Sequence, residues 1–114
     1  MTASHEATCD FEESTHPATW VGRSGRRYHF TRESSEGFVL IEGDLYLLAE
    51  GQAVRWVGSA RDLIEEQGSR ARFRDAVARG AAVYRMPAPQ DDLARLTAVW
   101  DLECGEPGNG RHAA

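Results

Sequence analysis

Arginine is the residue type whose abundance and spacing first suggest chemistry in this chain. All thirteen basic residues are Arg, and residues 61–85 hold six of them against four acids, a local charge of +2. Arg70 and Arg74 stand one helical turn apart, where guanidinium groups can contact phosphates. The alternatives are a solvated helix face and a coding bias, since Arg, Ala and Gly have GC-rich codons. Because the net charge is −5, we expect a protein partner rather than a nucleic acid.

Histidine and cysteine do not cluster in a way that predicts a metal site. Neither cysteine belongs to a CxxC pair, and the histidines are not at ligand spacing: Cys9, Cys104, His5, His16, His29 and His112. Metal sites of these residue types need several ligands at short, regular spacing. We therefore expect no metal and no cofactor. Two free thiols suit a cytosolic protein, and a disulfide between the two cysteines is the alternative.

Length and composition predict one small domain with a segment on each side. The 114 residues are 41% hydrophobic and 27% charged, which is typical of soluble globular domains. No apolar run approaches the roughly 18 residues that cross a bilayer, and the N-terminus lacks the features of a signal peptide. We therefore expect a cytoplasmic protein. Residues 1–18 are predicted to be a flexible acidic segment, residues 19–103 the domain, and residues 104–114 a tail.

Hydrophobic patterns along the domain predict its strands and helices. Apolar or alternating runs indicate strands at 20–22, 27–31, 38–41, 45–48, 54–57 and 81–86. Apolar residues three or four apart indicate helices at 60–66, 70–80 and from about 91 to 103. Ser59 and Ser69 are predicted N-caps, Gly68 is predicted to end the first helix, and Gly80 to follow the second.

This order of elements predicts an α+β fold with a small, mostly antiparallel sheet, flanking helices and an N-terminal β-hairpin. The third helix is expected to carry an apolar stripe of Leu93, Leu96 and Trp100, with Val99 alongside. Trp56 and Trp100 are expected to be core aromatics, and Tyr46 a buried or half-buried strand residue.

The stretch from Asp44 to Leu63 resembles the core of the GIY-YIG nuclease domain. That family has a strand with a Tyr motif, a turn, a strand with Tyr-Ile-Gly, then Ser or Thr and a helix near an Asp-Leu pair. Here 44–48 occupies the first place and 55–63 the second, with Gly58-Ser59 and Asp62-Leu63 at the matching points. Further segments agree with the family's order, or with the N-terminal extension of a bacterial GIY-YIG-like group: 20–28, 83–86, 91–102 and 106–109.

The resemblance implies phosphodiester hydrolysis with one divalent metal. In the family, two Tyr act at the attacking water, an Arg stabilises charge on phosphate, and a Glu holds the cation. Tyr46 matches the first Tyr, but Trp56 stands at the second. Glu66 stands at the Arg position, and Val99 or Ala98 at the metal-binding Glu. These replacements imply a catalytically degenerate member of the family.

Three functions follow as expectations. The first is a non-enzymatic, GIY-YIG-like binding module with a protein partner. The second is a DNA endonuclease that needs Mg²⁺ or Mn²⁺ and uses shifted residues: Tyr46, Arg61, Asn109 and either Asp101 or Glu103. The third is a small α+β protein-interaction domain unrelated to that family.

Overall fold

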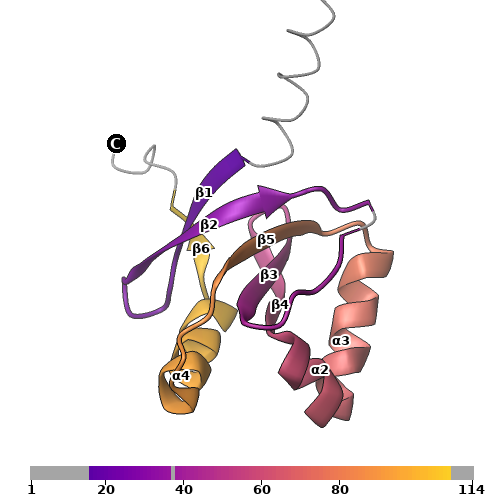
Figure 1. The fold of residues 1–114 in the computed structure, drawn as a ribbon. Helices are drawn as coiled ribbons and strands as arrows, with labels where there is room; N and C mark the ends of the chain where they lie inside the picture. The colour runs from indigo at the N-terminus through magenta and orange to yellow at the C-terminus, as the bar shows by residue number, and fades with distance from the viewer. Residues whose placement is uncertain (1–15, 37, 109–114) are drawn as a thin grey trace, which may run out of the picture.

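The computed structural model describes residues 16–36 and 38–108 of the chain. These residues form an antiparallel sheet of six strands together with three helices (Figure 1). The strands are β1 (His16–Val21), β2 (Arg27–Glu33), β3 (Asp44–Glu50), β4 (Ala53–Gly58), β5 (Ala82–Pro87) and β6 (Glu106–Pro107). The helices are α2 (Ala60–Glu65), α3 (Gln67–Ala78) and α4 (Asp92–Glu103). The sheet order is β4-β3-β5-β2-β1-β6. The predicted α+β class with an antiparallel sheet is confirmed.

Strand β3 is the centre of the fold because both of its faces are covered. Its residues from Leu45 to Ala49 are all buried. Alternate side chains of a strand point to opposite faces, so Leu45 and Leu47 enter one core while Tyr46 and Leu48 enter another. A strand buried on both faces reads as a continuous apolar run, which is what the sequence shows here.

The two cores lie on opposite faces of the sheet, and Figure 1 shows α4 apart from the pair α2 and α3. The α4-side core contains Trp20, Tyr28, Phe30, Leu45, Leu47, Ala49, Val57, Ala98, Val99 and Leu102. The α3-side core contains Tyr46, Leu48, Trp56, Ala76, Ala81 and Val83, with Phe38, Leu40, Leu63 and Phe73 packed against it. The hydrophobic effect of these two cores holds the helices onto the sheet.

The strand predicted at 38–41 is wrong, since this segment is an irregular loop across the α3-side core. Both edges of β3 are already paired, with β4 on one side and β5 on the other, so no place for a further strand remains there. The Tyr46 hydroxyl holds the loop instead. It accepts a hydrogen bond from the backbone N–H of Ile41 at 2.7 Å and donates to the carbonyl of Val39 at 3.3 Å.

The predicted boundary between the first two helices is also wrong. Helix α3 begins at Gln67, so Gly68 and Ser69 lie in its first turn. Ser69 is buried and does not cap, because its hydroxyl accepts a 2.8 Å hydrogen bond from the indole N–H of Trp56. The predicted N-cap at Ser59 is confirmed. The predicted place of Gly80, directly after the second helix, is also confirmed. Its φ of +74° is a backbone conformation that favours glycine.

Trp100 is not a core residue, contrary to the prediction. Its side chain is 60% exposed, whereas Val99 and Leu102 on the same helix are buried. Ala98, Val99 and Leu102 fill the space that α4 shares with the sheet. The helical period then turns Trp100 away from that face.

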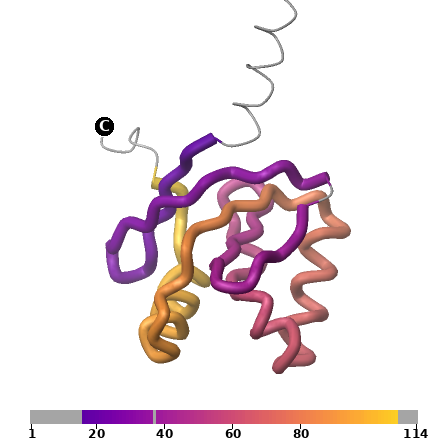
Figure 2. The backbone as a smooth tube through the Cα atoms, in the orientation of Figure 1, coloured from indigo at the N-terminus to yellow at the C-terminus, as the bar shows by residue number. Residues whose placement is uncertain are grey.

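The two ends of the described chain lie side by side, where Figure 2 shows yellow β6 beside indigo β1. Trp20 pairs with Pro107 and Val21 with Glu106. Strand pairing among the described residues therefore extends from His16 in β1 to Pro107 in β6. No helix in the described residues is long and apolar enough to cross a membrane.

Candidate functional site

Tyr46, the proposed catalytic Tyr, is a packed core residue. Its side chain is 1% exposed, and both hydrogen-bonding roles of its hydroxyl are taken by the loop backbone at Val39 and Ile41. Burial raises the pKa of this phenol above its ordinary value. A phenol that is shielded from solvent and hydrogen-bonded on both sides is placed to hold a loop, not to activate water.

Arg61, the second candidate catalytic residue, makes ion pairs at the surface rather than a contact with Tyr46. The Arg61 guanidinium is exposed and pairs with Asp92 at 2.8 Å and with Glu65 at 3.4 Å. The contact with Asp92 joins α2 to the start of α4, whereas the contact with Glu65 is an i,i+4 pair within α2. Asn109 lies outside the described residues, so its proposed role stays a prediction.

The positions that the resemblance assigns to one active site lie on different faces of the sheet. Trp56 belongs to the α3-side core, whereas Val99 belongs to the α4-side core. Asp101 is occupied by hydrogen bonds from Ser24 and Tyr28. Burial raises the pKa of Glu103, which lies in a small hollow with Arg72 beside β4. The described positions that the resemblance assigns to the metal are thus not gathered with Trp56 in one site.

No metal site forms within residues 16–36 and 38–108, since no three His, Cys, Asp or Glu side chains there are grouped closely enough. Cys104 is exposed and makes no disulfide with another described residue. Its predicted alternative partner, Cys9, lies outside the described residues.

The candidate nucleic-acid residues Arg70 and Arg74 have different roles. Arg70 donates hydrogen bonds to the carbonyls of Leu63 at 2.8 Å and Ile64 at 3.2 Å. These carbonyls are at the C-terminal end of α2, where a cation offsets the negative pole of the helix. Arg74 is exposed on α3. One of the two guanidinium groups is therefore committed to the fold.

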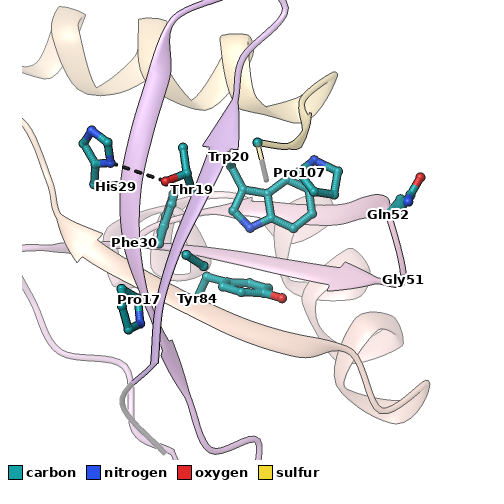
Figure 3. Close-up of a pocket in the computed structure, with 11 residues that line it drawn as sticks. Pro17, Thr19, Trp20, His29, Phe30, Gly51, Gln52, Tyr84 and Pro107 are labelled. Carbon is teal, nitrogen blue, oxygen red and sulfur yellow. Dashed lines mark hydrogen bonds between the residues drawn. The ribbon is translucent and has the colours of Figure 1, made fainter. Parts of the chain in front are cut away.

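A groove of about 590 Å³ lies on the α4-side face of the sheet, over β1, β2 and β5 (Figure 3). Three aromatic residues from three strands line it: Trp20 of β1, Phe30 of β2 and Tyr84 of β5. The remaining lining residues come from β1, β2, the β3–β4 turn and the β6 region: Pro17, Ala18, Thr19, His29, Gly51, Gln52, Pro107 and Gly108. A groove of this size is within the range of ligand pockets.

The aromatic rings of the groove hold one another edge to face. The Trp20 and Tyr84 ring centres are 5.4 Å apart with the planes at 69°, and those of Phe30 and Tyr84 are 6.5 Å apart at 78°. Edge-to-face contacts of this kind are favourable and fix the orientation of the rings. Figure 3 shows the Trp20 indole between Tyr84 and Pro107. The groove wall is therefore rigid before any ligand arrives.

Three hydrogen-bond donors at this groove make no hydrogen bond to another described residue: the Trp20 indole N–H, the Tyr84 hydroxyl and the Gln52 amide. Among the described residues, the one fully buried polar side-chain atom without a partner is Nε of Arg95. Gln52 is exposed and Tyr84 is half-buried, whereas Trp20 is only 2% exposed. Tyr84 and Gln52 therefore offer the accessible donors of the groove, and Trp20 supports the Tyr84 ring from below the surface.

Sequence reasoning missed this groove. Trp20 and Tyr84 were both placed on strands, but they are 64 positions apart, and nothing local indicates that β1 and β5 flank the same strand, β2. The sequence feature that could have indicated the groove is a pair of aromatic residues on strands, each with a proline close by. A scan of protein-family models, a search of curated proteins and a search of solved structures each find no match.

Proposed function

We propose that this chain is a non-enzymatic protein-interaction domain, which binds an extended, proline-containing segment of a partner protein in the groove of Trp20 and Tyr84. The observation that carries the proposal is a groove in which the half-buried Tyr84 ring rests edge to face on Trp20, beside the exposed amide of Gln52.

The chemistry of the groove suits a polyproline-type segment. Such a segment has no internal hydrogen bonds, so its carbonyl groups need donors from outside. Its ring faces pack against aromatic side chains, and the segment loses little entropy on binding because it is already extended. Tyr84, which is half-buried, offers an apolar ring together with a hydroxyl donor, the property that makes Tyr frequent at interfaces. The buried Trp20 holds this ring in place by an edge-to-face contact.

A protein partner also agrees with the charge of the chain. Phosphate backbones are bound through several cations, and affinity grows with their number. The net charge is −5, and Arg70 is already bonded to the end of α2. These properties favour the protein partner that the sequence indicates.

The proposal does not require the GIY-YIG resemblance. Descent from a degenerate nuclease remains a separate proposal about ancestry, supported by the sequence pattern from Asp44 to Leu63. The packed surroundings of Tyr46 support the non-catalytic part of that proposal.

The experiment is a titration of ¹⁵N-labelled protein with an octaproline peptide, with a Gly/Ser octamer as the control peptide. We expect the indole N–H signal of Trp20 to shift with octaproline alone. Tyr84→Phe and Gln52→Ala each remove one donor and should weaken binding about 2- to 10-fold. Gln90→Ala, at an exposed position before α4, is the matched control. No shift with octaproline, or equal shifts with both peptides, would contradict the proposal.

A further inference from the structure

Arg32, near the end of β2, is a charged residue beside the groove whose guanidinium has no acidic partner among the described residues. It is exposed, and it makes no ion pair or hydrogen bond with another described residue. Its guanidinium carbon lies over the Tyr84 ring, 5.7 Å from the ring centre. The ring attracts the cation, and this contact leaves the N–H donors of the guanidinium for another group.

The register of the sheet places Arg32 on the face that carries the groove. Arg32 stands opposite His16 of β1 on one side and opposite Tyr84 of β5 on the other. Phe30, two positions earlier on β2, lines the groove and belongs to the α4-side core. Residues two apart on a strand share a face, so Arg32 lies on this face as well. A segment that packs against the Tyr84 ring therefore passes within reach of the Arg32 guanidinium.

The surroundings of Arg32 carry positive charge without acids to neutralise it. None of the described residues that line the groove is acidic. Residues 16–32, which form β1, the β1–β2 turn and most of β2, include four Arg and no Asp or Glu. Glu33 comes next, but it points to the opposite face of the sheet and pairs with Arg85 at 2.9 Å. The local field here therefore favours a negatively charged ligand, although the whole chain has a net charge of −5.

We propose that the segment bound in the groove carries a carboxylate next to its prolines, and that Arg32 binds this carboxylate. The inference rests on the proposed function, and it adds the charge of the partner segment. A guanidinium and a carboxylate form two parallel, charge-assisted hydrogen bonds, which a neutral amide does not match in strength. The carboxylate also fixes where the segment sits, because repeated prolines alone present the same carbonyl groups at every turn.

The expected effect is a preference between segments rather than the whole affinity. Arg32 is exposed, so water and salt weaken any ion pair that it forms. Compared with a neutral segment of the same shape, a segment with the carboxylate should bind about 2- to 5-fold more tightly at low salt. The preference should largely disappear in about 1 M NaCl, where the Debye length is roughly 3 Å.

The test compares peptides with blocked ends that share a hexaproline centre and carry Glu, Gln or Arg at both ends. In titrations of the ¹⁵N-labelled full chain, the backbone signals of Phe30 and Tyr84 give the affinity, and the Nε–H signal of Arg32 reports the contact. The Glu peptide should bind most tightly and the Arg peptide least. Equal affinity for the Glu and Gln peptides overturns the inference and leaves the proposed function standing. Binding of none of the peptides overturns the proposed function and this inference with it.

Variants of Arg32 show whether the preference comes from this side chain. Arg32→Gln should bind the Glu and Gln peptides equally, and Arg32→Glu should bind the Arg peptide most tightly. Arg74→Glu is the matched control, because it makes the same change of charge at an exposed Arg of α3, against the other face of the sheet. This control should keep the preference for the Glu peptide. If Arg32→Gln weakens the Glu and Gln peptides by the same factor, Arg32 only supports the Tyr84 ring, and the inference is overturned.

Discussion

The hydroxyl of Tyr28 donates a 2.8 Å hydrogen bond to the carboxylate of Asp101 and so joins β2 to the last turn of α4. The same carboxylate accepts hydrogen bonds from the backbone N–H of Ser24 at 2.7 Å and from its hydroxyl at 2.8 Å. Through Asp101 the β1–β2 turn is fixed on α4. Tyr28 is also part of the α4-side core, so this cluster ties that core to the turn.

Asp101→Ala should destabilise the domain by about 2–4 kcal/mol, since three donors lose a charged acceptor. Tyr28→Phe removes one of these bonds and should cost about 1.5–3 kcal/mol. Asp75→Ala is the control. Its ion pair with Arg79 is exposed, so its removal should change stability by less than about 1 kcal/mol. Urea unfolding of the three variants gives the comparison, and equal losses for Asp101 and Asp75 would contradict the structural role of Asp101.

Gly22→Ala and Gly68→Ala should have opposite effects on stability. A Cβ on Gly22 would overlap the carboxylate of Asp101, so this variant should lose more than about 2 kcal/mol. A Cβ on Gly68 would meet only the Arg72 guanidinium at 3.5 Å, and Ala is the better helix former. Gly68→Ala should therefore gain up to about 1 kcal/mol. The test is the free energy of unfolding of each variant. A Gly22→Ala variant as stable as the unchanged protein would contradict the predicted overlap with Asp101.

Stability should fall as the pH rises from about 10 to about 12. Burial, together with the hydrogen bond to Asp101, raises the pKa of Tyr28 from 10.0 to about 12. The folded state thus holds this proton more tightly than the unfolded chain, so the stabilisation is complete below pH 10 and is lost as the pH approaches the folded value. The chain has no Lys to titrate in this range. Tyr28→Phe should flatten the decline, leaving the part due to Tyr46, whose pKa burial also raises. A decline of unchanged slope would exclude Tyr28 as its source.

Asp62 and Arg95 should be strongly coupled in a double-mutant cycle. The Arg95 guanidinium lies 3.0 Å from both carboxylate oxygens of Asp62, and both side chains are nearly buried. Asp62 also accepts from the backbone N–H of Ser59, so it links the start of α2 to α4. Asp62→Ala or Arg95→Met alone leaves one charge without its partner and should cost about 3–5 kcal/mol. The double variant should cost less than the sum, and simple additivity would speak against the coupling.

Tyr46→Phe should weaken the fold and change no nuclease activity. The loss of the hydrogen bonds to Val39 and Ile41 should cost about 1–2 kcal/mol, and hydrogen exchange at Ile41 should become faster. In a plasmid-nicking assay with Mg²⁺ or Mn²⁺ we expect no cleavage by the unchanged protein at high concentration. Cleavage that disappears in Tyr46→Phe would instead establish the endonuclease alternative.

Local patterns in the sequence identified most elements correctly, because strand and helix periods, caps and glycine turns act over a few residues. The strands around Leu45, Val54 and Val83 and the helix that begins after Asp91 follow from such patterns. The same patterns could not place Phe38–Ile41, whose apolar run reads as a strand. This segment cannot pair with β3, because β4 and β5 occupy both edges of that strand. Strand β5 comes more than thirty residues later in the chain, so a local pattern does not reveal it.

The sequence by itself determined the α+β class and the place of most strands and helices along the chain. Only the tertiary structure decided that Trp56 is buried while Trp100 faces outward, and that Tyr46 holds a loop. It also decided that Trp20 and Tyr84 share a groove. The physical reason is that burial and pairing depend on which strands become neighbours, and in this sheet β5 lies between β3 and β2 rather than beside β4.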